Sequence, residues 1–494
     1  MARLLAGGLS LSFLWAASRI EVAIPFPPVS LAERIVRLTP GDLATLFIDT
    51  LGQNAVRLLT VGSVVGFLVV FALLPLVPLQ SGPRRPYLLG AGVALASAGT
   101  AFIAPVPPRP GWVVGASLGA GILYAATLSW LLRVARPGLE RPDPERRRAL
   151  GLVVGATAAF AAGGTVLGRM TRRLAGPDTD VFLRTADEIT WTPSTPGFPD
   201  LPGLSPEVTA VRDHYVVDID LLDPVVEADG WALAVRGLVD RPVDLSFAEL
   251  QREFTLVEEP SVLVCISNPV GGDLVGSSRW TGVRLGEVLS RAGVREGAVD
   301  VVFRCADGYA ASLPVSAAHD PGVLLAVGQN GRALEWEHGF PCRVRAPGFY
   351  GVKNPKWVEA IEVVDRAHRD YWTLRGWSEE AIVRTQSRID VVTPAPTAGR
   401  PGWIAGVAWA GTRGVADVEV SVDGGTTWRR ATLSPSVSTL AWTRWAYRWV
   451  PTRPGRHTVM SRAVDRAGGI QEEVDRPPHP SGASGYHTFA VDVA

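Results

Sequence analysis

The sequence predicts a multidomain protein built from an all-α transmembrane bundle of about five helices, an α+β domain and an all-β immunoglobulin-like sandwich. Long apolar runs fill the first third of the chain, short strands and helices alternate in the middle, and a period-two pattern dominates the end. We expect a transmembrane anchor at residues 1–175, a Pro-rich linker at 176–206, the α+β domain at 207–393 and the sandwich at 394–494.

Bulk composition narrows the class of protein. The 494 residues are too many for a single hydrophobic core. The formal net charge is zero, so a nucleic-acid partner is not expected. Only 19% of the residues are charged and the mean hydropathy is positive, which indicates segments within a membrane.

The membrane prediction rests on five apolar runs. The last four have about the 20 residues needed to cross the hydrocarbon core, and the first is shorter. A signal peptide is not favoured for the first run, because no clear cleavage site follows it. The runs are Leu4–Ala17, Leu58–Leu79, Tyr87–Val106, Trp112–Leu132 and Ala149–Gly168.

Arginine placement predicts the orientation. Arg84 and Arg85 lie in one loop, and the loop before the fifth run is rich in arginine. The positive-inside rule places both loops in the cytoplasm, so we expect a multi-pass protein of the cell membrane with everything after the fifth span extracytoplasmic. The run Arg146–Arg148 resembles a twin-arginine export signal, with an ordinary anchor cluster as the alternative.

The histidines exclude one role for the membrane segment. All seven follow it, beginning at His214. Because a haem between helices usually needs histidine ligands, no haem is expected in this chain. The helices then act as an anchor, or as a docking surface for a separate electron carrier.

The stretch Ser261–Trp280 carries the clearest chemical signal. A buried apolar strand, Val262–Val264, delivers Cys265 to a loop that contains Asn268 and two adjacent glycines. Such a loop permits close approach to the backbone. The only lysines, Lys353 and Lys356, lie three residues apart, which indicates sites for a compact ammonium or a chance cluster.

The final section reads as a packing or dimerisation module. Its strands alternate with period two, and an Asp-Gly-Gly turn at 423–425 indicates a hairpin. About seven short strands in some 90 residues are typical of an immunoglobulin-like sandwich. We therefore expect a possible homodimer formed through this domain.

Several motifs occur together, in order: VCISNPVGGDL, RWTGVRLGEVL, DGYAASLP and HGFPCRVRAPGFYGVKNPKW. This combination, followed by the sandwich, resembles the sulfite oxidase family of molybdopterin-dependent oxidoreductases over about residues 205–490, and the anchor resembles its membrane-bound bacterial branch. The resemblance implies a molybdopterin cofactor, a small-molecule substrate and a separate electron-transfer partner. A soft thiolate beside the pterin dithiolene suits molybdenum, so Cys265 is expected to bind the metal.

The resemblance also implies the remaining site residues. Arg212 is expected to orient the substrate, and His214, in the same short motif, to face the metal and pterin. The other expected cofactor-binding residues are Asn268, Asp307, His338, Arg343, Asn354, Pro355 and Lys356.

Departures from the family leave the substrate open. Sulfite oxidases have arginines directly after the loop asparagine, where this chain has Pro269 and Val270. Their active-site tyrosine falls near Thr373–Gly376, and Tyr371 is out of register. Sulfite oxidation and S- or N-oxide reduction therefore both stay open.

Two other functional classes also remain possible. One is a non-catalytic extracytoplasmic binding module. The other is a cysteine hydrolase, in which His214 activates Cys265. For Cys305 and Cys342, plain packing and a disulfide are the alternatives.

Overall fold

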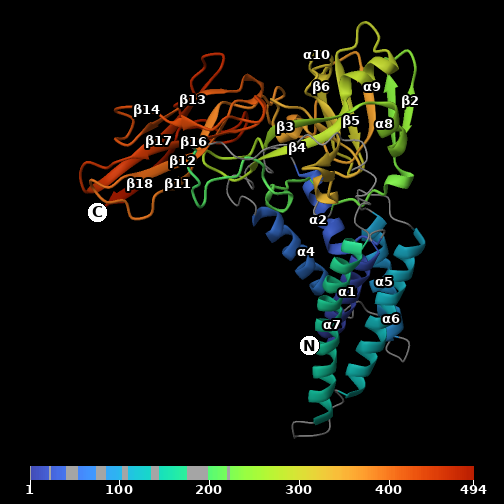
Figure 1. Ribbon diagram of the computed structural model, residues 1–494. Helices are drawn as coiled ribbons and strands as arrows, with labels where there is room; N and C mark the ends of the chain where they lie inside the picture. The colour runs from blue at the N-terminus through green and yellow to red at the C-terminus, as the bar shows by residue number, and fades with distance from the viewer. Residues whose placement is uncertain are drawn as a thin grey trace. The chain divides into compact units, whose positions relative to one another are not determined.

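The computed structural model describes residues 2–21, 24–39, 54–73, 85–102, 110–134, 144–174, 198–219 and 223–494 (Figure 1). The chain forms two compact units. One contains Met1–Gly176 with Ile219–Val225, and the other contains Pro177–Asp218 with Val226–Ala494. Most of the expected linker at 176–206, and much of the loops used to predict the membrane orientation, lie outside the described residues.

The first unit is helical. The described part of each of the five apolar runs is helical, and α2 is an additional amphipathic helix that begins with two prolines. The helices pack closely through small residues, because a Cβ on Gly90 or Gly121 would lie 2.4 Å from the other residue's carbonyl oxygen. The helices are α1 (Ala2–Ile20), α2 (Pro27–Leu38), α4 (Asn54–Leu73), α5 (Arg85–Phe102), α6 (Pro110–Val134) and α7 (Pro144–Leu174).

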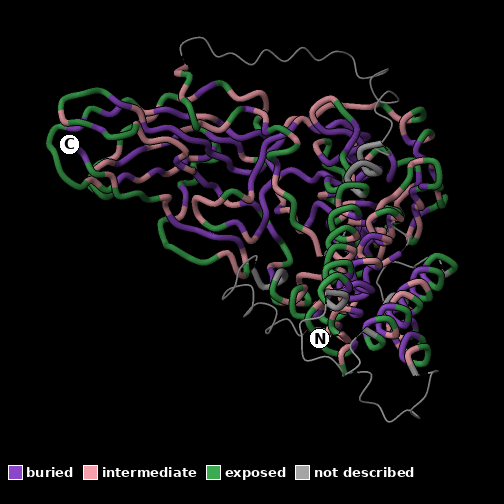
Figure 2. Tube along the Cα trace, turned by 90° about the horizontal axis from the view of Figure 1, so that it is seen from below, coloured by how far each residue is buried: buried purple, intermediate pink, exposed green. Residues whose placement is uncertain are grey.

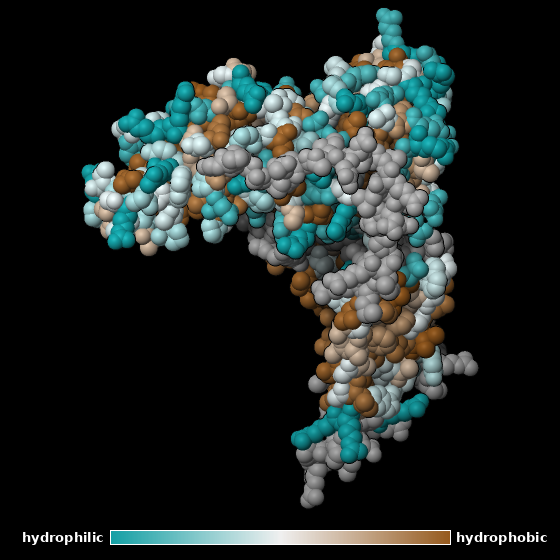
Figure 3. All heavy atoms as spheres, in the orientation of Figure 1, coloured by the Kyte–Doolittle hydropathy of each residue, from teal (hydrophilic) through white to brown (hydrophobic). Residues whose placement is uncertain are grey.

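Two of these helices have the length and composition to cross a membrane. Within the described parts of the chain they are Gly111–Arg133 and Arg147–Leu167, while Leu58–Leu73 is apolar but shorter. Hydrophobic residues cover much of this unit in Figure 3. Helices are therefore present in all five expected regions, but two of them qualify as candidate spans among the described residues, and the bundle of five spans stays a prediction.

The second unit begins with a five-stranded mixed sheet in the order β2-β1-β10-β5-β6. Strands β1 and β10 are parallel, and the other pairs are antiparallel. Ser246 and Glu249 form a capping box that starts α8. The elements are β1 (Ala232–Gly237), β2 (Val243–Ser246), α8 (Phe247–Glu253), β5 (Asp300–Cys305), β6 (Ala310–Pro314), α10 (Val315–Ala318) and β10 (Val358–Val364).

A second five-stranded sheet carries the Cys265 loop. Its order is β3-β4-β7-β8, with β9 paired to β7. The second half of β3 and most of β4 are buried. Figure 2 shows buried segments, in purple, along the trace of the C-terminal part of the chain. The elements are β3 (Leu256–Val264), β4 (Val275–Arg284), α9 (Leu285–Ala292), β7 (Leu324–Gln329), β8 (Arg332–Ala333) and β9 (Arg343–Arg345).

The last part of the chain is the predicted β-sandwich of two four-stranded sheets, ordered β11-β12-β16-β15 and β14-β13-β17-β18. Strand β11 pairs with β12, so the sandwich begins before the predicted boundary at 394. The strands are β11 (Gln386–Val392), β12 (Gly402–Trp409), β13 (Val415–Ser421), β14 (Arg429–Arg430), β15 (Thr432–Leu433), β16 (Thr443–Trp449), β17 (Gly455–Asp465) and β18 (His487–Val493).

Candidate active site

Cys265 lies one residue beyond the end of β3, as the sequence pattern predicts. Its side chain is buried, and its Sγ lies 3.0 Å from the Ser267 hydroxyl oxygen. Burial raises the pKa of the Cys265 thiol, and the Ser267 hydrogen bond lowers it only in part. A thiol in this setting keeps its proton near neutral pH, and it would bind a metal as the thiolate.

Asn268 shapes the loop that follows. Its Oδ1 accepts a hydrogen bond of 2.9 Å from the Leu274 N–H, and the Cys265 N–H donates to the Leu274 carbonyl at 2.9 Å. These bonds close residues 265–274, which we call the cysteine loop, at its base. The Asn268 side chain therefore stabilises the loop through its hydrogen bond with Leu274. Its expected contact with the cofactor stays a prediction.

The buried His214 side chain contacts the rings of three other residues. The Tyr215 ring stacks on it at 5.3 Å, and the Trp280 and His338 rings meet it edge-on at 5.8 and 5.7 Å. Burial, and then the neighbouring His338, lower the pKa of His214 to about 3, so its imidazole is neutral. Gly276 leaves room for this ring, because a Cβ there would lie 2.6 Å from the His214 Cδ2.

His338 and Arg343 come together beside His214. His338 ends a short 3₁₀ helix, Trp336–His338, and its Nε2 lies 3.1 Å from the Val211 carbonyl oxygen. Burial, with the charges of Arg343 and Lys356, lowers the pKa of His338 to about 4. The Arg343 guanidinium donates to the His338 carbonyl at 2.8 Å.

The segment Asn354–Lys356 is held by its neighbours. The Asn354 amide nitrogen donates to the Tyr350 carbonyl at 2.9 Å, and its Oδ1 accepts from the Ala346 N–H at 2.7 Å. The Pro355 carbonyl accepts from the Val344 N–H at 2.9 Å. Lys356 forms an ion pair with Asp218, and its Nζ lies 4.5 Å from the centre of the Trp357 ring.

Arg212 and Asp307 lie in different surroundings from this cluster. The Arg212 side chain is 86% exposed, and its Nε lies 3.6 Å from the Asp213 carboxylate. Asp307 is buried, and its Oδ1 accepts from the Tyr309 N–H at 2.9 Å. The structure shows neither of them among the buried rings around His214, and their expected roles stay predictions.

Sequence reasoning gave no role to Tyr215 or Arg345, and it singled out Lys353 only as one of the two lysines of the chain. Arg345 donates to the Ser261 hydroxyl at 2.9 Å, and its guanidinium lies 4.9 Å from the Trp280 ring centre, against 5.0 Å for Arg343. The spacing of Arg343 and Arg345 on β9 places both on one face, which was a readable signal. Lys353 forms a buried ion pair with Asp370.

The donor set around Cys265 fits an anionic cofactor bound through sulfur. Arg343, Arg345 and Lys356 supply positive charge, which a phosphate requires. Several buried polar atoms have no hydrogen-bond partner within the described part of the chain, and such atoms in native proteins usually meet a ligand or water. They include His214 Nε2, the Tyr215 hydroxyl, Ser277 Oγ and Arg343 Nε.

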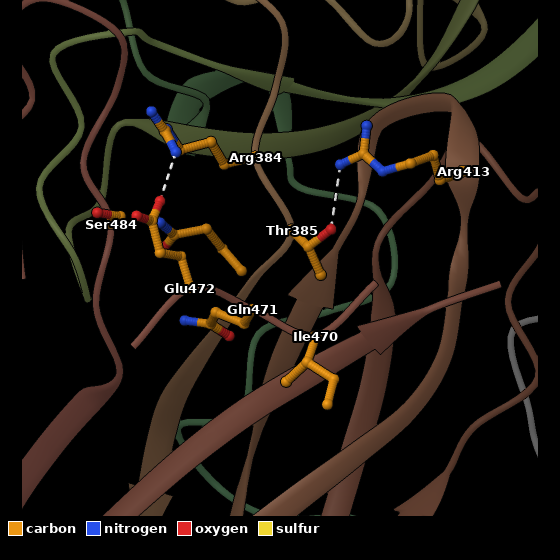
Figure 4. A pocket seen from close by; sticks show the side chains of 8 residues that line it. Arg384, Thr385, Arg413, Ile470, Gln471, Glu472 and Ser484 are labelled. Atoms are coloured by element: carbon orange, nitrogen blue, oxygen red, sulfur yellow. Dashed lines mark hydrogen bonds and ion pairs between the residues drawn. The ribbon is translucent and has the colours of Figure 1, made fainter. Parts of the chain in front are cut away.

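The other two cysteines, and a cavity in the C-terminal part of the chain, do not belong to this site. Cys305 and Cys342 are buried free thiols, so the disulfide is not formed. A cavity of about 210 Å³ between β11 and the β17–β18 connection is lined by Arg384, Arg413 and Glu472 among others (Figure 4). Arg384 already donates to Glu472 at 2.7 Å and Arg413 to Asp465 at 2.9 Å, so these charges stabilise the local fold.

A buried thiol at a strand end, a cluster of buried histidines and arginines in the same unit and a sandwich after them are the features expected of a molybdopterin oxidoreductase. Residues 221–372 match the model of the oxidoreductase molybdopterin binding domain. Residues 379–476 match that of the Mo-co oxidoreductase dimerisation domain.

Known relatives narrow the class to a family. Sulfite oxidase of Gallus gallus is 32% identical over 320 residues, which are 55% of this chain and 68% of that protein. The chain therefore belongs to the sulfite oxidase family of molybdenum-dependent oxidoreductases, whose cofactor is molybdopterin.

Two further comparisons mark the limits of this likeness. Nitrate reductase [NAD(P)H] of Hordeum vulgare is 32% identical over 289 residues, but the chain spans only 32% of that protein's length and 47% of its own. The crystal structure of the sulfane dehydrogenase SoxCD from Paracoccus pantotrophus has a TM-score of 0.51 at 22% identity. It covers 63% of this chain and 87% of its own, and it shows a shared fold alone.

Proposed function

We propose that this chain is a membrane-anchored molybdopterin oxidoreductase that exchanges an oxygen atom and two electrons with a small substrate on the extracytoplasmic side. The observation that carries the proposal is the buried Cys265 thiol, which lies in one cluster with two buried polar atoms that have no hydrogen-bond partner, His214 Nε2 and the Tyr215 hydroxyl. Tyr215 and Cys265 are close enough that each charge would disfavour the other.

Each residue of the cluster has a distinct proposed role. Cys265 would hold the molybdenum, and the bound cofactor supplies the two-electron redox centre with open oxo positions. Arg343 and Lys356 would neutralise the pterin phosphate, and His214 and His338 would donate or accept hydrogen bonds as neutral imidazoles. Asn354 and Pro355 would hold the segment Asn354–Lys356 in place. Arg212 would orient the substrate.

The substrate site differs from that expected for sulfite. Pro269 and Val270 offer no positive charge where arginines are expected. The Tyr371 ring lies under the Arg375 guanidinium, at 3.6 Å from its Cζ to the ring centre. We therefore propose either sulfite oxidation or the reduction of a neutral S- or N-oxide, with a separate protein exchanging the electrons.

The remaining parts of the chain support this role. The apolar helices Gly111–Arg133 and Arg147–Leu167 are proposed to anchor the chain in the cell membrane. The match to the dimerisation domain favours a homodimer formed through the sandwich. The proposed domains are the anchor at 1–175, the linker at 176–206, the α+β domain from 207 and the sandwich to 494. The predicted boundary between the last two, at 393/394, moves to the start of β11 at Gln386, because β11 pairs with β12 of the sandwich.

Metal analysis of the full-length protein tests the proposal. Wild-type protein made with an active pterin pathway should contain about one molybdenum per chain, and Cys265→Ala should lose turnover while retaining pterin through its phosphate contacts. Cys305→Ala is the matched control, since it also removes a buried free thiol. Full turnover by Cys265→Ala would disprove the ligand assignment.

A substrate screen then separates the two directions. Sulfite and methionine sulfoxide are added in turn while the absorption of the molybdenum centre is followed. Reduction of the centre by sulfite supports oxidation, and reoxidation of the reduced centre by the sulfoxide supports oxide reduction.

A further inference from the structure

The outer side of the cysteine loop is held by the C-terminal sandwich. Arg388 of β11 donates from Nη1 to the Gly272 carbonyl oxygen at 2.9 Å. Gly272 lies in the half of the loop that returns to β4, and its own N–H donates to the Pro269 carbonyl at 3.0 Å. A single guanidinium of the sandwich thus binds the backbone next to the internal bonds of the loop.

The same guanidinium also binds the segment that leads to His214. Its Nη2 donates to the Ser205 hydroxyl at 2.8 Å, and its Nε donates to Asp390 Oδ1 at 2.7 Å. The other Asp390 oxygen accepts from the Ser205 N–H at 3.1 Å. The Arg388 and Asp390 side chains are only 14% and 6% exposed, so solvent screens these bonds weakly.

A second contact from the sandwich lies beside the first. The Ile389 N–H donates to Nδ1 of His487 on β18 at 2.9 Å, which fixes the imidazole. The opposite nitrogen lies so near Gly271 that a Cβ there would be 2.1 Å away. Gly271 also has a φ of +76°, so both its conformation and this approach require glycine.

We propose that Arg388 and Asp390 are positioning residues, which fix the position of the cysteine loop relative to the segment Ser205–His214. The guanidinium is planar and has donors in a fixed fork, so its three acceptors must keep one relative geometry. The two chain segments that carry Cys265 and His214 therefore both depend on one side chain of the sandwich. The inference rests on the proposed function, in which Cys265 binds the metal.

Hydrogen exchange of the metal-free, full-length protein tests directly whether the Arg388 side chain holds the cysteine loop. In Arg388→Ala, the Gly272 and Leu274 amides should exchange at least about tenfold faster, since the loop loses a hydrogen bond from a charged group. Arg388→Lys keeps the charge without the fork and should give an intermediate increase. Arg430→Ala is the control, because Arg430 pairs with Asp417 on an exposed part of the sandwich and should leave the loop unchanged.

The loaded enzyme provides a second readout. Arg388→Ala should retain pterin but show a weakened thiolate-to-molybdenum absorption band and a lower kcat, with KM changed less than kcat. Ser205→Ala removes only the hydrogen bond from Arg388 to the Ser205 hydroxyl. It should therefore speed amide exchange in residues 205–214 and leave exchange at Gly272 unchanged.

Unchanged exchange of the Gly272 and Leu274 amides in folded Arg388→Ala would contradict the positioning role of Arg388. This outcome does not depend on whether molybdenum enters the protein. If that variant does not fold, Arg388→Lys decides by the same measurement. A failure of the proposed function appears separately, as missing molybdenum in the wild-type protein.

Discussion

Gly276→Ala is the sharpest test of the His214 environment. Gly276 lies on β4, and its φ is outside the left-handed region, so alanine is acceptable to the backbone. The added Cβ would lie 2.6 Å from His214 Cδ2 and 2.7 Å from Nε2, so the ring must move by roughly 0.8 Å to reach ordinary contact. The Tyr215, Trp280 and His338 rings limit that movement.

Overpacking of this kind costs about 1–3 kcal/mol, which for a unit of this size lowers Tm by roughly 2–12 °C. The displaced His214 should also reduce molybdopterin loading. The assay is thermal unfolding of the metal-free protein, together with molybdenum per chain after loading. Gly286→Ala is the control, because its Cβ would meet its nearest neighbours at 3.4 Å and alanine favours the helix.

A double-mutant cycle separates the clash from other effects. In a His214→Ala background the imidazole is absent, so Gly276→Ala should cost much less than in the wild type. Equal costs in both backgrounds, or normal stability and loading of Gly276→Ala, would refute the reasoning.

Two further predictions concern stability. Lys353→Met leaves Asp370 buried without its cation, so it should destabilise the protein by about 3–5 kcal/mol in denaturant unfolding, and adding Asp370→Leu should recover most of the loss. A smaller effect in the single variant than in the double would contradict this. Hydrogen bonds from Thr427 lower the pKa of Asp423 to about 2, so the hairpin stabilisation should persist above pH 4 and disappear as the pH falls through 2. The Thr427 amide protection in wild type and Asp423→Ala should therefore converge at low pH, and a constant difference down to pH 2 would exclude the carboxylate as its source.

Local patterns were sufficient to predict most elements. The apolar runs became helices, and Ser246 and Gly293 begin and end the helices that their chemistry indicates. The alternating sequence VVDID at Val216–Asp220 is typical of a strand, but its described residues, 216–219, form none. Its alternation is too short to compete with the tertiary contacts of this segment, which include the Lys356–Asp218 ion pair.

The sequence by itself determined that a cysteine stands at the end of a buried strand, because alternation and glycine placement depend on neighbours along the chain. It also indicated the His338–Arg343 and Asn354–Lys356 motifs through family resemblance. Only the tertiary structure decided that Arg343 and Arg345 both lie near Trp280, that Lys353 is buried against Asp370, and that Arg388 reaches the cysteine loop. Arg388 and Gly272 are 116 residues apart, and no periodicity encodes such a contact. It exists because two sheets pack against each other, and that packing depends on the whole unit.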